Sequence, residues 1–359
     1  MSDRIARTLE HLAALVAFDT RNPPRRIGVG GIFEYLTSNL RGLRLELTDH
    51  GDGAVSLLAI RGAPELLFNV HLDTVPASPG WTADPLTLRT TETHATALGA
   101  CDIKGAAAAL LTAAERTRGP AAFLFTSDEE GSDPRCIRAF LAKPHGFANV
   151  LVAEPTRGLA VLAHRGISSA RAKFRGRAGH ASERQIDSAV HHAMNFGARA
   201  LDWFGTFDDA RFESLTGTRF NIGRVEGGVK ANVVAAEAEL RFGFRPLPSQ
   251  DFDELHARLV KLAPPGSLEV YEETFRGPAL PCGPSAREHL ERAKELTRVL
   301  GLPAGDAVDF WTEAALFSAQ GITAIVFGPG DVGQAHAADE SVSIEELDTV
   351  AKIYERLMS

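Results

Sequence analysis

The chain has 359 residues, of which 44% are hydrophobic and 23% charged, and a formal net charge of −8. The length suggests about two domains, and the composition is that of a globular protein with ample material for a core. The negative charge argues against a nucleic-acid-binding protein, which would normally show a basic face. No apolar run approaches the roughly 18 residues of a transmembrane helix, so no membrane association is expected.

The three cysteines, Cys101, Cys136 and Cys282, lie far apart and form no CxxC pair. This pattern suits a reducing compartment without a disulfide framework. The charged, amphipathic N-terminal segment has neither the apolar core nor the cleavage site of a signal peptide. We therefore expect a cytoplasmic protein.

In chain order, the first half alternates strand-like and helix-like segments. Three short apolar runs are typical of buried parallel strands: 65–72, 121–127 and 149–154. Two segments are typical of helices: 103–117 and 135–142. Asp133 and Pro134 are expected to form the N-cap and first turn of the second helix. Strands alternating with helices predict an α/β sheet.

The middle of the chain has a different pattern. Its expected elements are, in order, a strand in 168–179, a helix in 188–204, two strands in 220–246, a helix in 251–263 and a strand in 267–275. The order β-α-β-β-α-β predicts a ferredoxin-like sandwich with one exposed sheet face. The α/β pattern then resumes. We therefore predict a discontinuous α/β domain (1–165 and 277–359), with a mostly parallel mixed sheet flanked by helices, and an inserted α+β domain (166–276).

Acids and histidines follow the expected strands of the α/β domain. The residues concerned are His71, Asp73, Glu129, Glu130, Glu154 and His336, together with Asp102 just before an alanine-rich helix. Ligands bind beyond the carboxyl ends of strands in open α/β sheets. Each residue alone is more often an ordinary turn residue or a solvated charge. Together they form a set of nitrogen and oxygen donors that suits zinc or a similar divalent ion.

The same segments resemble, in order, the motifs of the M20 metallopeptidase family. They are HLDTVP (71–76), GACDIKGA (99–106), TSDEEG (126–131), AEPT (153–156), GRAGHAS (176–182) and GPGDVGQAHAADE (328–340). The resemblance extends over essentially the whole chain and its two-domain layout. It implies that the α/β domain is catalytic and that the insert is a lid and dimerisation domain.

The resemblance also implies two divalent metal ions, usually zinc and replaceable by cobalt. By motif position, His71 and Glu154 would bind one ion, Glu130 and His336 would bind the other, and Asp102 would bridge the two. Metal ions in such a pair lower the pKa of a bound water molecule and polarise an amide carbonyl.

Three further residues have catalytic roles by the same resemblance. Asp73 would orient the His71 imidazole, and Glu129 would be the general base. If residues 129 and 130 lie on an extended segment, their side chains point to opposite sides and can serve different tasks. His180 in the insert would stabilise the oxyanion, often from a partner subunit in this family. A surface turn histidine is the alternative for His180.

The resemblance also implies that Asn232 and Arg245 in the insert bind the substrate, where an arginine could bind a carboxylate through two hydrogen bonds. Both residues could equally be strand residues that face solvent. The resemblance implies a small N-acetyl amino acid as the substrate and a homodimer formed through the insert.

The segments FDTRNPPR (18–25) and FWTEA (310–314) resemble members of the family that deacetylate an amino acid of arginine biosynthesis. A Phe310–Trp311 wall would suit the neutral ureido end of acetylcitrulline, and Glu313 could instead bind the ammonium of acetylornithine. Ordinary core packing is the alternative for the aromatic pair. The resemblance favours acetylcitrulline as the substrate, with acetylornithine as the alternative, and the pocket argument from these side chains leaves the choice open.

Other functions have less support. A non-catalytic binding protein with this fold would show a degraded set of metal ligands, whereas here every motif acid and histidine is present. The chain has no GxSxG nucleophile motif and no phosphate-binding glycine motif. Cys101, next to the bridging aspartate, is expected to be a small buried residue and not a competing metal ligand.

Overall fold

The computed structural model describes residues 2–24, 27–131 and 133–359. Arg25, the last residue of the motif FDTRNPPR, lies outside the described residues. The chain separates into two compact units. The first comprises Met1–Leu162, His289–Gly305 and Thr312–Ser359, and the second comprises Ala163–Glu288 and Asp306–Trp311.

The first unit is built on a six-stranded mixed sheet in the order β1-β2-β6-β3-β7-β16. The strands are β1 (Arg44–Asp49), β2 (Val55–Arg61), β3 (Leu66–His71), β6 (Ala121–Thr126), β7 (Asn149–Val152) and β16 (Thr323–Val326). The last four run parallel to one another, while β2 is antiparallel to both of its neighbours, β1 and β6. The predicted α/β class with a mixed sheet is therefore confirmed, and the β1–β2 edge is an addition to it.

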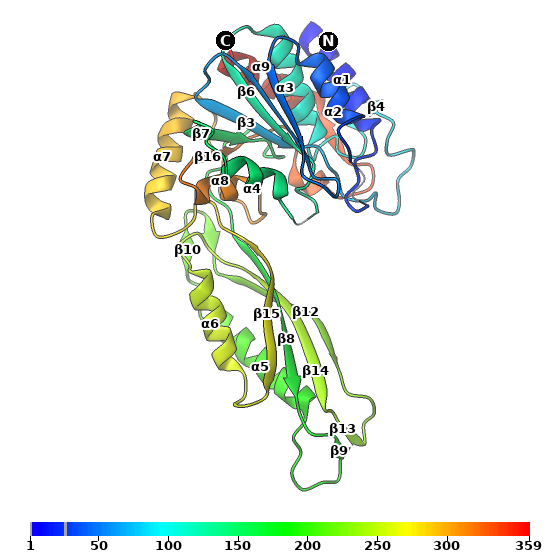
Figure 1. The fold of residues 1–359 in the computed structure, drawn as a ribbon, viewed down its shortest axis with the longest axis vertical. Helices are drawn as coiled ribbons and strands as arrows, with labels where there is room; N and C mark the ends of the chain where they lie inside the picture. Colours follow the sequence, from blue (N-terminus) through cyan, green and yellow to red (C-terminus); the bar gives the residue numbers. More distant parts are fainter. Residues whose placement is uncertain (1, 25–26, 132) are drawn as a thin grey trace. The chain divides into compact units, whose positions relative to one another are not determined.

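Helices cover both faces of this sheet (Figure 1). On one face α1 (Asp3–Val16), α3 (Lys104–Arg116) and α9 (Ile344–Leu357) pack against one another, with α2 (Ile32–Asn39) beside α3. The alanines of α3 are all buried, and their small side chains allow close packing. On the other face α8 (Ala314–Ala319) packs on β7 and β16 and contacts α4 (Arg135–Leu141).

Shorter elements complete the first unit. A three-stranded sheet joins β17 (Ser341–Ser343), β5 (His94–Thr96) and β4 (Arg89–Thr90). The 3₁₀ turn η1 (Val332–Gln334) follows β16, and α7 (Ala286–Val299) crosses the sequence boundary between the units. Among the residues that the structure describes, every helix is too short or too polar to span a bilayer.

The cap of α4 differs from the prediction. Its N-cap is Pro134, which provides no side-chain hydrogen bond, and the Asp133 carboxylate accepts a hydrogen bond from Arg135 Nε at 2.6 Å. The backbone N–H of Cys136 instead donates to Asp128 Oδ2 at 2.9 Å. The buried Asp128 therefore supplies the carboxylate at the start of α4, where it also faces the positive end of the helix dipole.

The second unit contains a four-stranded antiparallel sheet in the order β12-β14-β8-β15. The strands are β8 (Ile167–Arg175), β12 (Arg219–Gly227), β14 (Glu237–Arg245) and β15 (Leu268–Gly277). Two helices, α5 (Ala189–Gly205) and α6 (Phe252–Leu262), enclose a core rich in phenylalanine and alanine with one sheet face. This strand order and the β-α-β-β-α-β chain order are those of a ferredoxin-like sandwich.

Two short ribbons extend from this sandwich. One pairs β10 (Arg211–Phe212) with β11 (Leu215–Thr216), and the other pairs β9 (Gly179–His180) with β13 (Val233–Val234). The segment 306–311 is held in the second unit by the fully buried Arg165, which pairs with Asp309 and donates hydrogen bonds to the carbonyl oxygens of Thr216 and Gly217.

Candidate metal centre

The parallel strands of the first unit bring the predicted donors to one edge of the sheet. His71 is the last residue of β3, Glu130 follows β6, and Glu154 follows β7. His336 lies in the loop after β16, and Asp102 directly precedes α3. This arrangement follows from the parallel pairing, because the carboxyl ends of parallel strands meet at the same edge.

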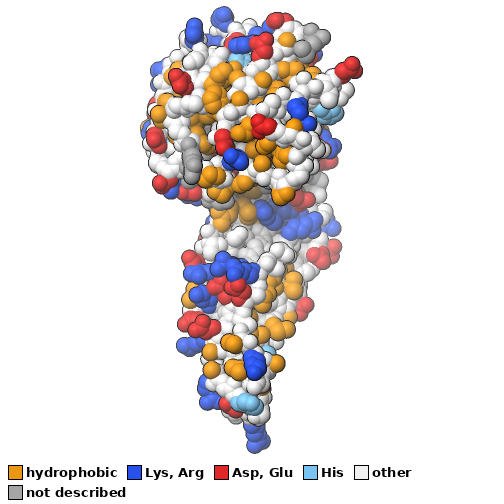
Figure 2. All heavy atoms as spheres, turned by 90° about the vertical axis from the view of Figure 1, so that its right-hand side faces the viewer, with side chains coloured by type: hydrophobic (Ala, Val, Ile, Leu, Met, Phe, Trp, Pro, Cys, Tyr) orange, Lys and Arg blue, Asp and Glu red, His pale blue; other side chains and the backbone are white. Residues whose placement is uncertain are grey.

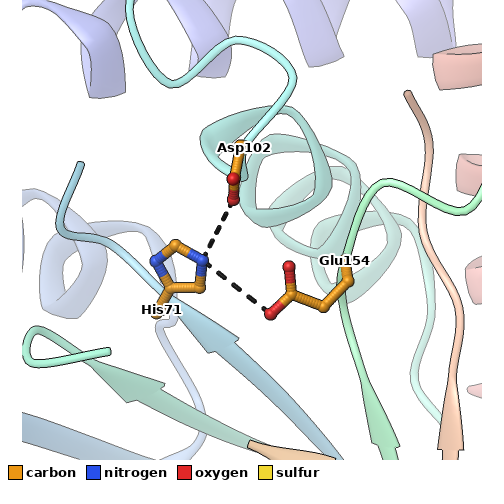
Figure 3. Close-up of side chains that lie close together, drawn as sticks. All are labelled: His71, Asp102 and Glu154. Atoms are coloured by element: carbon orange, nitrogen blue, oxygen red, sulfur yellow. Dashed lines mark hydrogen bonds and ion pairs between the residues drawn. The ribbon is translucent and has the colours of Figure 1, made fainter. Parts of the chain in front are cut away.

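One group of donors consists of His71, Asp102 and Glu154 (Figure 3). His71 Nε2 lies 3.2 Å from Asp102 Oδ1 and 3.9 Å from Glu154 Oε1. The three donor atoms lie within 4.8 Å of one another. A nitrogen and two carboxylate oxygens at this spacing are a suitable partial shell for a divalent ion.

A second group shares Asp102 with the first and adds Glu130 and His336. His336 Nε2 lies 3.1 Å from Glu130 Oε1 and 3.4 Å from Asp102 Oδ2. Asp102 therefore presents one carboxylate oxygen to each histidine. This is the placement that a bridging carboxylate between two ions requires.

Asp73 connects His71 to the turn that carries Glu129 and Glu130. Its carboxylate lies 3.5 Å from His71 Nδ1 and accepts hydrogen bonds from the backbone N–H groups of Glu129 (3.3 Å) and Glu130 (3.0 Å). The Asn22 amide donates a further bond at 2.9 Å. The His71 ring is also held through Nδ1 by the backbone oxygen of Asp73 at 3.0 Å, which leaves Nε2 for a metal ion.

Glu129 and Glu130 have different environments, but they lie on a turn and not on the extended segment that the sequence suggested. Glu130 faces His336, whereas the Glu129 carboxylate makes no hydrogen bond or ion pair with any described residue. The Asp73 carboxylate, which holds both backbone N–H groups, fixes this turn. The turn gives the Glu129 and Glu130 side chains different directions. The sequence had suggested that the alternation of side chains along a strand would do so.

The cluster has an unbalanced charge that a cation would relieve. Burial, together with the neighbouring carboxylates of Glu130, Asp73 and Asp102, raises the pKa of Glu129 to about 8 against the lowering effect of His71. Hydrogen bonds with Asp102 and Glu130 raise the pKa of His336 to about 10. Burial lowers the pKa of His71, but Asp102 and Asp73 outweigh it, and the net shift is strongly upward. Without a metal ion the site therefore holds protons that metal binding would displace.

These observations make the donor set fit a pair of divalent ions. The nitrogen and oxygen ligands match zinc and similar metals, and the buried carboxylates lack a compensating Lys or Arg ion pair among the described residues. Cys101 contributes no ligand. Burial raises the pKa of its thiol far above the ordinary value, and Sγ donates to the Asp331 carbonyl oxygen at 3.3 Å, as expected for a small buried cysteine.

Glu313 lies in the same unit but outside both donor groups. It is 1% exposed, and its Oε2 accepts a hydrogen bond from Thr126 Oγ1 at 3.4 Å. Burial raises its pKa well above the ordinary value, with Asp128 and Glu129 acting in the same direction. Glu313 is thus a buried carboxyl at the end of β6.

The remaining predicted site residues belong to the second unit. His180 is exposed on β9. The backbone N–H of Ala181, which follows His180 in the chain, donates a hydrogen bond to the backbone oxygen of Asn232 at 3.1 Å. Arg245 ends β14 and borders a cavity of about 680 Å³ on the sheet face away from the helices. Trp311 Nε1 donates to the Pro278 carbonyl oxygen at 2.9 Å, and its ring lies against Gly277.

One residue of this centre was not anticipated from the sequence. Glu340 is 1% exposed and accepts three backbone hydrogen bonds from the loop that carries Asp102. It belongs to the motif GPGDVGQAHAADE, four positions after His336. The only sequence feature that could have indicated Glu340 is the acid pair Asp339–Glu340 directly before a strand. The fold is needed to show that Glu340 contacts the loop of Asp102.

The chain matches a model of peptidase family M20/M25/M40 over residues 67–359. It is 58% identical to an N-acetyl-L-citrulline deacetylase of Xanthomonas campestris pv. campestris, over 100% of this chain and 99% of that protein. An acetylornithine deacetylase of Myxococcus xanthus is 30% identical over 97% of this chain and 95% of its own length.

Among solved structures, the aminopeptidase PepT of Bacillus cereus is similar in fold, with a TM-score of 0.76, 19% identity and coverage of 99% and 98% of the two chains. The YXEP protein of Bacillus subtilis, described as a dinuclear metal-binding peptidase, gives a TM-score of 0.68 at 14% identity, with 98% of each chain covered. At these identities the likeness concerns the fold. The family model and the full-length relatives together show that this chain belongs to peptidase family M20/M25/M40.

Proposed function

We propose that this chain is a two-metal hydrolase that removes the acetyl group from an N2-acetyl amino acid in arginine biosynthesis, with N-acetyl-L-citrulline as the substrate. The observation that carries the proposal is the pair of donor groups that share Asp102, beside the Glu129 carboxylate, which pairs with no residue in the described part of the chain. The identity to an N-acetyl-L-citrulline deacetylase over the full chain supports the choice of substrate.

His71 and Glu154 would bind one ion, His336 and Glu130 the other, and Asp102 both. We propose zinc, with cobalt able to replace it, because both metals accept imidazole and carboxylate ligands. When bound, the ions lower the pKa of a water molecule and polarise the amide carbonyl.

Glu129 acts as the general base and then as the general acid. It accepts a proton from the attacking water, whose oxygen bonds to the acetyl carbonyl carbon. It then donates that proton to the amino-acid nitrogen as the C–N bond breaks, which releases acetate and the free amino acid. Its pKa of about 8 in the metal-free protein supports this role, because both protonation states are then accessible near neutral pH.

His180 is assigned to the oxygen that gains negative charge when water adds to the carbonyl carbon. The Ser182 backbone N–H donates to His180 Nδ1 at 3.3 Å, so Nδ1 acts as an acceptor. In a neutral imidazole the proton is then on Nε2, which is free to donate a hydrogen bond to an oxyanion.

Arg245 and Asn232 are assigned to substrate binding. Arg245 lies directly opposite Arg219 in the antiparallel register of β14 and β12, and both residues line the 680 Å³ cavity. Like charges at paired positions repel each other, and neither guanidinium pairs with an acid among the described residues. A substrate carboxylate bound to Arg245 would relieve this repulsion and could form two parallel hydrogen bonds.

The side-chain end of the substrate is assigned to Trp311 and not to Glu313. Glu313 is nearly fully buried and bonded to Thr126, so it is poorly placed to meet a substrate ammonium. Trp311 is half-buried. This difference favours the neutral ureido group of citrulline over ornithine.

The test is a comparison of kcat/KM for N-acetyl-L-citrulline and N2-acetyl-L-ornithine, with chelated enzyme as the control. We expect a preference of at least about tenfold for the citrulline derivative and loss of both activities on chelation. A preference for acetylornithine would overturn the substrate assignment, but the assignment as a two-metal hydrolase would remain. No hydrolysis of either substrate by zinc-loaded protein would favour a non-catalytic binding protein.

We also propose that the insert, residues 166–276, is a lid and dimerisation domain whose partner is a second copy of this chain. Strand β12 is an edge strand with exposed Val225, and the following loop exposes Val229 to 93%. The neighbouring helix α5 exposes Met194 and Leu201 at a spacing of seven residues, which places them on one face. Figure 2 shows exposed hydrophobic side chains among charged ones in this unit.

An exposed edge strand with apolar neighbours readily pairs with another strand, and pairing with its own copy gives a two-fold symmetric dimer. Light scattering of the wild type should give the mass of a dimer. A Val225→Lys variant should shift the equilibrium towards monomer, and a wild-type monomer at micromolar concentration would refute the proposal.

A further inference from the structure

The loop that carries Asp102 is held by a single side chain from a distant part of the sequence. Glu340 Oε1 accepts hydrogen bonds from the backbone N–H groups of Cys101 and Asp102, both at 2.8 Å. Its Oε2 accepts a third from Gly99 at 3.0 Å. Burial raises the pKa of Glu340 to about 7, while these three backbone hydrogen bonds favour the ionised carboxylate. In that form the two 2.8 Å bonds have the length of charge-assisted hydrogen bonds, which are stronger than bonds between neutral groups.

The position of this carboxylate is also favourable with respect to α3. The helix has no side-chain N-cap, because its N-cap residue is Ile103. The first N–H groups of a helix and those just before it need acceptors, and a negative charge near them is stabilised by the helix dipole. Glu340 accepts from the N–H groups that directly precede α3, whereas the N–H groups of Lys104 and Ala106 in its first turn donate to the backbone oxygens of Gly99 and Ile103.

The orientation of Asp102 matters for both donor groups at once. Its Oδ1 faces His71 and its Oδ2 faces His336. A rotation of the Asp102 backbone would therefore displace both oxygens together. The hydrogen bond from Asp102 N–H to Glu340 opposes such a rotation directly, and those from Cys101 and Gly99 hold the preceding turn.

Glu340 is itself held in place by its neighbours. The preceding residue, Asp339, pairs with Arg89 Nη2 at 2.6 Å and accepts a hydrogen bond from Thr82 Oγ1 at 3.0 Å. The backbone oxygen of Glu340 accepts a bond from Ala97 N–H at 3.1 Å. The segment that ends in Glu340 also carries His336, so one loop supplies a donor atom and the carboxylate that orients the shared donor.

We propose that Glu340 is a positioning residue that sets the affinity of both metal sites together, by holding the Asp102 backbone in the bridging orientation. The inference rests on the two-metal site of the proposed function. It adds that the two ions are coupled through a residue that contacts neither of them. Side chains that orient metal ligands typically change metal affinity by about 10- to 100-fold when they are removed.

The experiment is a titration of chelator-treated, metal-free protein with Co²⁺, followed by calorimetry and by the visible absorption of the bound ion. In Glu340→Gln the amide keeps one acceptor oxygen, but its NH₂ group cannot accept the remaining hydrogen bonds. We expect weaker binding of both ions, by about 10- to 100-fold, and an altered absorption spectrum. The matched control, Glu345→Gln on the exposed start of α9, should bind both ions as the wild type does.

A second variant distinguishes this coupling from the loss of one site. Glu130→Gln removes a donor of one group only and should weaken one of the two binding steps. If Glu340→Gln weakens only one step, or binds both ions with wild-type affinity, the proposal is wrong. A Glu340→Ala variant should be weaker still; if it fails to fold, the Glu340→Gln titration alone decides.

The outcome does not depend on catalysis. If the wild type binds two ions but hydrolyses no acetylated amino acid, the proposed function fails while the Glu340 titration still supports or refutes the coupling. If the wild type binds fewer than two ions, both proposals fail.

Discussion

The two units each contain a cluster of histidine and carboxylate side chains, and the clusters differ in how their charges are balanced. We call the first the metal cluster: His71, Asp102, Glu129, Glu130, Glu154 and His336. The second, the Ser168 cluster, comprises Ser168, His256, Tyr271, Glu273 and Arg276. In the metal cluster carboxylates predominate and Glu129 has no partner among the described residues, whereas the Ser168 cluster contains its own cation.

The contacts of the Ser168 cluster satisfy its polar groups. His256 Nε2 lies 2.9 Å from Ser168 Oγ and 2.9 Å from Glu273 Oε1, and His256 Nδ1 lies 2.7 Å from the Tyr271 hydroxyl. Arg276 Nε donates to Glu273 Oε1 at 2.9 Å. Such a network stabilises the interior without any ligand.

The residue types of the Ser168 cluster match a nucleophile, base and acid, but the geometry does not. In a catalytic triad the acid and the nucleophile contact opposite nitrogens of the histidine. Here Glu273 and Ser168 contact the same nitrogen, and Ser168 is fully buried. The comparison shows that unbalanced charge and convergent donor atoms distinguish a candidate metal site from a structural polar cluster of similar composition.

The largest expected effect separates the two clusters by rate. Glu129→Gln removes the general base and should lower kcat by about 10²- to 10⁴-fold while metal content, measured by elemental analysis, stays unchanged. Ser168→Ala, at the centre of the other cluster, should leave kcat within a small factor. A Glu129→Gln enzyme with wild-type turnover would remove the base assignment, and a large loss in Ser168→Ala would contradict the comparison itself.

Metal binding should stabilise only the protein with an intact metal cluster. At a free Zn²⁺ concentration 100-fold above the dissociation constant of each site, the wild type should gain about 2.7 kcal/mol in free energy of unfolding per bound ion over the chelated protein. Asp102→Asn, which weakens both donor groups, should gain much less. Calorimetric melting with and without zinc measures the difference, and equal gains in the two proteins would show that zinc binds elsewhere.

The Ser168 cluster should contribute to stability independently of metal. Ser168→Ala removes hydrogen bonds to His256 and Glu273, which remain bonded to each other, so we expect a loss of about 1 kcal/mol. Denaturant unfolding should show the same loss in chelated and zinc-loaded protein. A loss that disappears when zinc is added would indicate that the two clusters are energetically linked.

The smallest effects concern pH, and they have opposite signs in the two clusters. Burial lowers the pKa of His256, so the folded state resists protonation and stability falls as pH drops below about 6.5. Hydrogen bonds raise the pKa of His336 to about 10 in the metal-free protein. The contribution of protonated His336 to the free energy of unfolding is fully present below about pH 6.5. It is lost as the pH rises through about 10.

Melting temperatures of metal-free protein from pH 5 to 10 test both signs. His256→Asn should flatten the acidic side of the profile, and His336→Asn the alkaline side. The His336 effect should be modest, because its side chain is 53% exposed and water screens its partners. If His256→Asn changed the melting temperature on the alkaline side, or His336→Asn on the acidic side, the pKa shift of that histidine would have the opposite sign to the one expected.

Much of the fold was predictable because its signals are local. The apolar runs at β3, β6 and β7 and the alanine-rich α3 lie within a few residues of their expected bounds. The edge strand β1 and its neighbour β2 were missed; β1 is largely exposed and carries no apolar run. The cap of α4 was assigned to Asp133 when Asp128 supplies the carboxylate, because a side chain can reach a helix start through space from outside the adjacent sequence.

The sequence by itself determined the donor types and their positions after strands, since strand order and parallel pairing place such residues at one edge of a sheet. Only the tertiary structure decided how these residues divide their tasks. The Asp73 carboxylate holds the turn that separates Glu129 from Glu130, and Glu340 holds the loop of Asp102. Both are contacts between segments distant in the chain. The physical reason is that backbone N–H groups in loops take whichever acceptor the fold brings near, and spacing along the sequence does not encode that choice.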